Sequence, residues 1–226
     1  MKISKYLGIL ITVLLFISCR SEKQHTAVIE IIDLQSFISN DSFLEFAKSN
    51  HIDSASLFNR QNRWVIYTNR KRVDNLLMNI HSAFPNQKIN VFPEPFYNFN
   101  GAEYCKKKPA EEWSHVIMTA NLVENPIMQQ EYLDYHKFQF SKWREVPEGF
   151  CNADFQQVLV FRNGRQLMLV ISIPNGKTLA ELNPKTTENN PRVDEWNSIM
   201  SRYQEGIEGA EEGEVWTSYL NLTSNQ

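Results

Sequence analysis

The chain has 226 residues, of which 42% are hydrophobic, and a formal net charge of −3. This length is enough for one large domain or two small ones, and the composition is that of an ordinary globular protein. Basic and acidic residues alternate along most of the chain, which argues against a nucleic-acid-binding protein because such proteins concentrate positive charge on one face.

Residues 1–19 have the pattern of a bacterial lipoprotein signal peptide. A basic start, Met1 to Lys5, precedes a short apolar run that ends at Ser18 and Cys19. The run is too short for a membrane-spanning helix. We therefore expect Cys19 to become the lipidated first residue of an exported protein, anchored to a membrane in the periplasm or at the outer membrane of a bacterium. Ordinary signal cleavage with an incidental cysteine is the alternative.

Residues 20–26 are a polar tether, and residues 27–104 predict one ferredoxin-like unit. Strand-like and helix-like runs follow in the order β-α-β-β-α-β, which is the split βαβ arrangement. Asn40 and Asp41 look like the cap of the first helix. The expected elements are a strand at 27–32, a helix at 41–50, strands at 54–58 and 63–67, a helix at 73–84 and a strand at 89–92.

The same order repeats in residues 113–226, after a polar, proline-bearing linker at 105–112. Two copies of one unit predict an α+β fold of tandem ferredoxin-like units, paired as an intramolecular pseudo-dimer that resembles a dimeric α/β barrel. The expected elements are a strand at 115–122, a helix from Pro126 that runs on irregularly to Val146, a hairpin of 157–161 and 166–171, a helix from Asn190 to Tyr203 and a strand at 215–220.

Two further cysteines, Cys105 and Cys151, leave two readings open. In an exported protein they can form a disulfide, but nothing in their spacing demands one, and two free thiols fit equally well. They lack the close Cys or His pairs of a structural zinc site, and we expect no metal.

Tyr132 and His136 lie four residues apart, so both side chains project from one face of the expected helix. A histidine can give and receive protons near neutral pH. A polar-face histidine beside a core tyrosine is the structural alternative. The surrounding sequence favours a site, because five short motifs accompany this pair: Glu131-Tyr-Leu-Asp-Tyr-His136, Trp143-Arg-Glu-Val146, Phe161-Arg-Asn-Gly-Arg-Gln-Leu-Met168, Asn190-Pro-Arg-Val-Asp-Glu-Trp196 and Glu214-Val-Trp216.

In this order and spacing, the motifs resemble the L-rhamnose mutarotase family, which includes bacterial L-fucose-directed relatives. Members are small dimeric α/β proteins with the same order of elements. The resemblance runs from His115 to Leu222. The Trp143 motif lies about three residues further from the first motif than in the family, as if residues 138–140 were inserted. Arg144 stands where the family has proline.

The resemblance implies an aldose mutarotase, which opens the sugar ring and recloses it on the other face of the anomeric carbon. Such a reaction needs one group to protonate the ring oxygen and one to take the proton of the anomeric hydroxyl, and it needs no cofactor. By position in the motifs, His136 would be the catalytic proton donor, and Tyr132 and Trp196 would bind the substrate. Asn197 and Val158 replace a tryptophan and a tyrosine of rhamnose-type members, so L-rhamnose, L-fucose or a similar aldose remain candidate substrates.

The first unit has no Tyr-x-x-x-His, so only one half of the chain would keep its acid and the other would serve as scaffold. A non-catalytic carbohydrate-binding or accessory lipoprotein is the alternative function. Heme or other small-molecule chemistry of dimeric α/β-barrel proteins is a third, and it shares the fold but not the motifs.

Overall fold

The computed structural model describes residues 25–223. The expected signal peptide, with Cys19, and most of the expected tether lie outside the described residues. Within the described part, no helix is long and apolar enough to cross a membrane.

The N-terminal half has the predicted β-α-β-β-α-β order. Its elements are β1 (Thr26–Ile32), α1 (Asn40–Ser49), β2 (Leu57–Arg60), β3 (Arg63–Asn69), α2 (Val73–Ala83) and β4 (Lys88–Phe92). Two local expectations are corrected. Ser39 caps α1 in place of Asn40 and Asp41, because its side chain accepts the backbone N–H of Ser42 in a capping box. The first hairpin strand begins at Leu57, because residues 54–56 form a 3₁₀ turn that Asp53 caps.

The C-terminal half follows the same order with additional short helices. Its elements are β6 (Trp113–Leu122), α4 (Pro126–Lys137), α5 (Gln139–Lys142), α6 (Glu145–Asn152), β7 (Gln157–Asn163), β8 (Gln166–Pro174), α7 (Leu179–Leu182), α8 (Pro191–Met200), β9 (Gln204–Glu205) and β10 (Thr217–Asn221). The expected irregular helix thus divides into α4, α5 and α6. Asn125 begins α4, because its side chain accepts the N–H groups of Ile127 and Met128.

The two halves share one antiparallel sheet because the last strand of each half pairs with a strand of the other half. The strand order is β4-β1-β3-β2-β10-β6-β8-β7-β5, with β9 beside β6. Strand β10 pairs first with β6 of its own half and then with β2 of the other half. Strand β5 (Pro95–Asn100), which was not predicted from the sequence, follows β4 and pairs with β7. A short helix, α3 (Gly101–Tyr104), comes after it.

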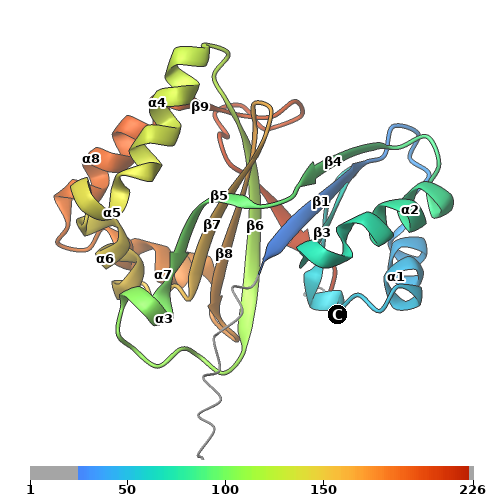
Figure 1. Ribbon diagram of the computed structural model, residues 1–226, viewed down its shortest axis with the longest axis horizontal. Helices are drawn as coiled ribbons and strands as arrows, with labels where there is room; N and C mark the ends of the chain where they lie inside the picture. Colours follow the sequence, from blue (N-terminus) through green and yellow to red (C-terminus); the bar gives the residue numbers. More distant parts are fainter. Residues whose placement is uncertain (1–24, 224–226) are drawn as a thin grey trace, which may run out of the picture.

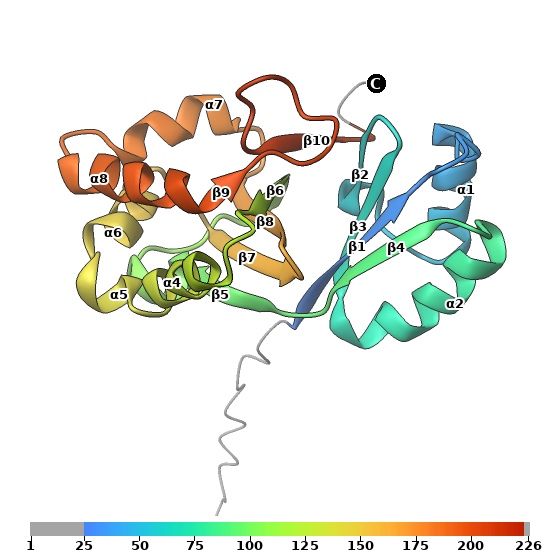
Figure 2. The same ribbon diagram turned by 90° about the horizontal axis from the view of Figure 1, so that it is seen from above.

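The inner faces of the two sheet halves pack against each other and close the strands into a nearly complete barrel. Figures 1 and 2 show α1 and α2 on one flank and α4, α5, α6 and α8 on the other, with the strands between them. The fold is therefore the expected tandem ferredoxin-like arrangement. The buried residues of the interior come from both halves: Val28, Phe58, Val65, Tyr67, Phe92, Ile117, Leu159, Phe161, Met168, Val170 and Tyr219.

A buried carboxylate ties the halves together inside this arrangement. Glu30 on β1 is 0% exposed and accepts four hydrogen bonds. Arg63 Nη1 (2.9 Å) and Tyr219 Oη (2.6 Å) donate to Oε1. Asn90 Nδ2 and Gln166 Nε2, both at 2.9 Å, donate to Oε2. Because Tyr219 and Gln166 belong to the C-terminal half, this network holds the two halves of the sheet in a fixed position relative to each other.

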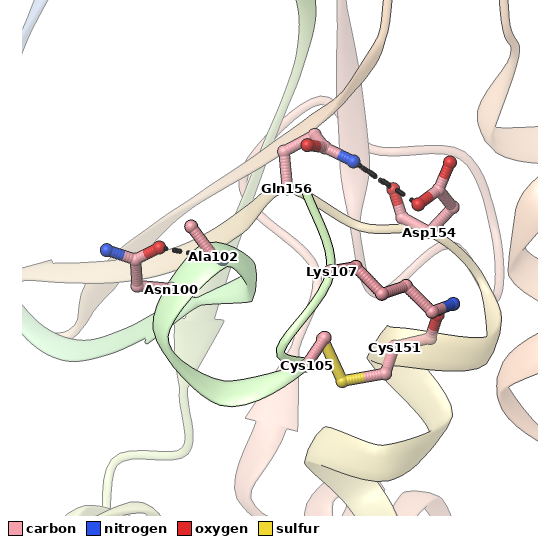
Figure 3. The surroundings of a disulfide bond; sticks show 7 residues. All are labelled: Asn100, Ala102, Cys105, Lys107, Cys151, Asp154 and Gln156. Atoms are coloured by element: carbon pink, nitrogen blue, oxygen red, sulfur yellow. Dashed lines mark hydrogen bonds between the residues drawn. A yellow bond between two sulfur atoms is a disulfide. The ribbon is translucent and has the colours of Figure 1, made fainter. Parts of the chain in front are cut away.

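Cys105 and Cys151 form a disulfide, which decides between the two readings left open by the sequence (Figure 3). Their Cα atoms are 5.5 Å apart, and the bond joins the end of α3 to α6. Lys107 Nζ also donates to the carbonyl of Cys151 at 3.1 Å. The segment that follows the exchanged strand β5 is thereby fastened to the C-terminal half.

Candidate active site

A cavity of about 520 Å³ lies between the outer face of the C-terminal sheet and the helices that cover it. Its volume is within the range of small-molecule sites. Strands β7 and β8 form the floor, and α4, α6 and α8 contribute to the walls. The side chains of Tyr132, His136 and Trp196 all line this cavity. The structure thus brings together the three residues that the sequence predicted as a site.

His136 is held in one orientation by its own helix. Its Nδ1 lies 3.0 Å from the main-chain carbonyl oxygen of Tyr132, one turn earlier in α4. A carbonyl can only accept, so Nδ1 carries the hydrogen and the lone pair of the neutral ring is on Nε2. No hydrogen bond to Nε2 is present among the described residues. The imidazole is 8% exposed, and burial lowers its pKa to about 4. His136 is therefore neutral at pH 7, with a proton acceptor at Nε2.

Tyr132 lies beside His136, with ring centroids 4.4 Å apart. Its hydroxyl oxygen accepts a hydrogen bond from Gln204 Nε2 at 3.1 Å, and Gln204 Oε1 in turn accepts from Trp216 Nε1 at 3.2 Å. Strand β9 positions Gln204 by pairing with the end of β6. Burial raises the pKa of Tyr132, so the phenol keeps its proton. That proton is free to be donated into the cavity.

Trp196 on α8 forms the aromatic wall opposite α4. Its ring meets the ring of His136 edge to face, at a centroid distance of 5.3 Å. Trp143 packs on its other side at 5.5 Å, and the guanidinium of Arg192 lies 4.0 Å above the Trp143 ring. These contacts fix Trp196, which leaves a flat apolar surface beside the imidazole.

The two residues that replace a tyrosine and a tryptophan of rhamnose-type sequences lie in the same cavity. Val158 on β7 and Asn197 on α8 are part of its lining. The cavity therefore differs in shape and hydrogen bonding from one with tyrosine and tryptophan at these positions.

Two further lining residues were missed from the sequence. Tyr97 comes from the exchanged strand β5, and its hydroxyl donates a short hydrogen bond to Gln139 Oε1. Gln139 is buried and begins α5, inside the segment that reads as an insertion in the motif pattern. The insertion was visible in the sequence, but nothing there indicated that β5 reaches this cavity.

The remaining histidine of the C-terminal half serves another part of the fold. His115 Nδ1 is 2.9 Å from Ser172 Oγ, and its ring packs on Tyr67. Burial lowers its pKa as well. Among the residues described, no group of three or more His, Cys, Asp or Glu side chains is placed to hold a metal ion.

Comparison with known proteins agrees with the motifs. Residues 115–222 match the family model described as L-rhamnose mutarotase. The C-terminal half is similar to the L-rhamnose mutarotase family over this range. The five motifs and the cavity both fall within, or directly against, this mutarotase-family half.

Two relatives match parts of the chain. A UPF0734 protein of Dictyostelium discoideum is 28% identical over 118 residues, which are 49% of this chain and 88% of that protein. An L-fucose mutarotase of Xanthomonas campestris pv. campestris is 26% identical over 74 residues, which are 33% of this chain and 58% of that protein.

Two solved structures align with most of the chain at low sequence identity. A candidate monooxygenase from Fusobacterium nucleatum aligns with a TM-score of 0.47 and 8% identity, over 87% of this chain and 91% of that one. An uncharacterized ferredoxin-fold protein from Listeria monocytogenes, related to antibiotic biosynthesis monooxygenases, aligns with a TM-score of 0.40 and 12% identity, over 87% and 94%.

Proposed function

We propose that the protein is an aldose mutarotase that interconverts the α and β anomers of L-rhamnose, L-fucose or a similar sugar. The observation that carries the proposal is the placement of His136 between Tyr132 and Trp196 in one cavity within the mutarotase-family half. An aldose has a C–H face that can lie on Trp196 and hydroxyls that can bond to the polar side chains.

In the proposed reaction His136 acts first as a base. Its neutral Nε2 takes the proton of the anomeric hydroxyl while the bond between C1 and the ring oxygen breaks. The ring oxygen receives a proton from the Tyr132 phenol. After rotation about C1–C2, the ring oxygen attacks the other face of the carbonyl and returns its proton to Tyr132, and His136 returns its proton to the new anomeric hydroxyl. The implied role of His136 as donor thus belongs to the closing step.

This reaction is measured by NMR exchange spectroscopy between the two anomers of a panel of deoxysugars. We expect catalysed exchange for the unmodified protein and only the spontaneous rate for His136→Ala. His115→Ala is the matched control, because it removes a partly buried histidine outside the cavity. An exchange rate that is unchanged in His136→Ala would refute the assignment.

A non-catalytic carbohydrate-binding protein is the second candidate, and the replacements at Val158 and Asn197 favour it. In that case the same sugars would bind, but exchange would not exceed the spontaneous rate. Two results together would favour this candidate. The unmodified protein would show no catalysed exchange, and His136→Ala would still bind the sugar.

We further propose that the protein is exported and lipidated at Cys19. The signal pattern of residues 1–19 supports this. The Cys105–Cys151 disulfide supports export too, because such bonds persist in oxidising compartments. Cys19→Ser should move the protein from the membrane fraction to the soluble fraction, and an unchanged distribution would count against the anchor.

A further inference from the structure

We propose that Tyr97 supplies to this site the sugar-contacting hydroxyl that Val158 lacks. The inference rests on the proposed function and deepens it, because it places a specificity-determining group on a strand outside the mutarotase-family segment. If it holds, the N-terminal half contributes chemistry to the site and is more than a scaffold.

The register of β5 against β7 places Tyr97 on the same face of the sheet as Val158. Tyr97 lies opposite Val160, and Phe99 lies opposite Val158. Residues opposite each other in an antiparallel pair point to the same face, and so do residues two apart on one strand. The side chain of Tyr97 therefore lies on the same face of the sheet as that of Val158, on the neighbouring strand, and both line the cavity.

An irregularity in β5 directs two consecutive aromatic residues to the same histidine. The register shifts between Pro95 and Tyr97, so Phe96 is the extra residue of a bulge. Successive residues of a regular strand point to opposite faces, and a bulge re-aims them. The ring centroid of Phe96 is 5.6 Å from that of His136, and the ring centroid of Tyr97 is 5.2 Å from it. The bulge thus turns β5 toward the catalytic side of the sheet.

The phenol of Tyr97 is held ready to accept a hydrogen bond. Its O–H donates to Gln139 Oε1, and Phe140 stacks on its ring at a centroid distance of 5.7 Å. Burial, with a smaller effect of Tyr104, keeps the phenol protonated by raising its pKa. A phenol that donates its only proton still has lone pairs on oxygen. A sugar hydroxyl in the cavity can donate to this oxygen, and Gln139 fixes the direction from which it does so.

The experiment compares Tyr97→Phe with Tyr104→Phe. The first removes only the oxygen in the cavity and leaves the ring contacts in place. The second removes a neighbouring phenol that packs on Phe140 but is not part of the lining. Binding of each sugar is followed by NMR titration, and exchange is measured on the same samples. We expect Tyr97→Phe to weaken binding of the preferred sugar on the order of tenfold, the loss of one hydrogen bond, and Tyr104→Phe to leave it unchanged.

A set of monodeoxy analogues separates a contact from a structural effect. If Tyr97 accepts from one sugar hydroxyl, the analogue without that hydroxyl should bind the unmodified protein and Tyr97→Phe equally well. A purely structural role would weaken all analogues by the same factor, and that result would overturn the inference.

The two proposals fail in different ways. Exchange that is catalysed equally by the unmodified protein and Tyr97→Phe, with equal binding, would overturn the role of Tyr97 and leave the mutarotase proposal intact. Sugar binding that depends on Tyr97 without any catalysed exchange would overturn the mutarotase proposal and keep Tyr97 as a sugar contact.

Discussion

The Nδ1 atom of His136 lies 3.0 Å from the carbonyl oxygen of Tyr132, so the two residues of the Tyr-x-x-x-His motif are joined through the backbone of one helical turn. Their spacing of four has a second use besides placing both side chains on one face. It lets the residue that carries the phenol also set the tautomer of the imidazole. The motif thus leaves Nε2 as the ring nitrogen that can accept a proton.

The first prediction is the pH dependence of catalysis. Burial lowers the pKa of His136 to about 4, and protonation at Nε2 removes the acceptor. The rate of anomer exchange in excess of the spontaneous rate should be constant from about pH 7 down to about pH 5 and fall as pH decreases through about 4. The measurement is NMR exchange at each pH, with His136→Ala as the blank. A rate that falls already near pH 6.5 would contradict it.

The second prediction concerns stability. Since the pKa of His136 in the folded protein is lower than the ordinary histidine value of 6.5, the unfolded state binds more protons between these two pH values. The free energy of unfolding should therefore fall as pH decreases from about 6.5 to about 4, by up to about 3 kcal/mol from this group. Urea unfolding at pH 7 and pH 4.5 measures this. His136→Gln should show a smaller pH effect, and what remains includes His115, whose pKa is shifted in the same direction.

The third prediction concerns Glu30. Glu30→Ala leaves Arg63 without its buried partner and removes the carboxylate that accepts from Tyr219 and Gln166 of the other half. The free energy of unfolding should fall by about 3–5 kcal/mol. Asp74→Ala, which breaks a solvent-exposed pair with Arg70 at 3.8 Å, is the control and should cost less than about 1 kcal/mol. Similar effects of the two substitutions would show that Glu30 does not join the halves.

The fourth prediction concerns the disulfide. Cys105 and Cys151 are separated by 46 positions. Closing a loop of this length lowers the conformational entropy of the unfolded chain, which stabilises the fold by about 4 kcal/mol. The double variant Cys105→Ala, Cys151→Ala should unfold at correspondingly lower urea concentration. If both forms unfold at the same midpoint, the disulfide has no stabilising role.

Much of the fold follows from patterns that act over a few residues. The β-α-β-β-α-β order of each half could be predicted from periodicity. So could the meeting of Tyr132 with His136, since helical spacing decides it. Trp196 was placed by resemblance, and the fold brings it to them.

The features that were not predicted depend on contacts distant in sequence. Strand β5 begins at Pro95, just after Pro93, and its partner β7 is about sixty residues away, so no local pattern reveals the pairing. Tyr97 becomes a site residue only through that pairing. The low pKa of His136 results from burial, which three elements create together. The disulfide likewise could not be predicted, because it depends on the approach of α3 to α6 in the folded protein.

The strand exchange has a consequence for how the protein behaves when it is dilute. In a homodimer built on the same plan, a strand lent between subunits would be lost on dissociation, and any site it completes would depend on protein concentration. Here β5 and the cavity that it reaches belong to one covalent chain. Strand β5 meets β7 within one molecule, so the effective concentration of β5 at this cavity is set by the chain that links them. The site should stay assembled in a single molecule, however few copies a cell carries.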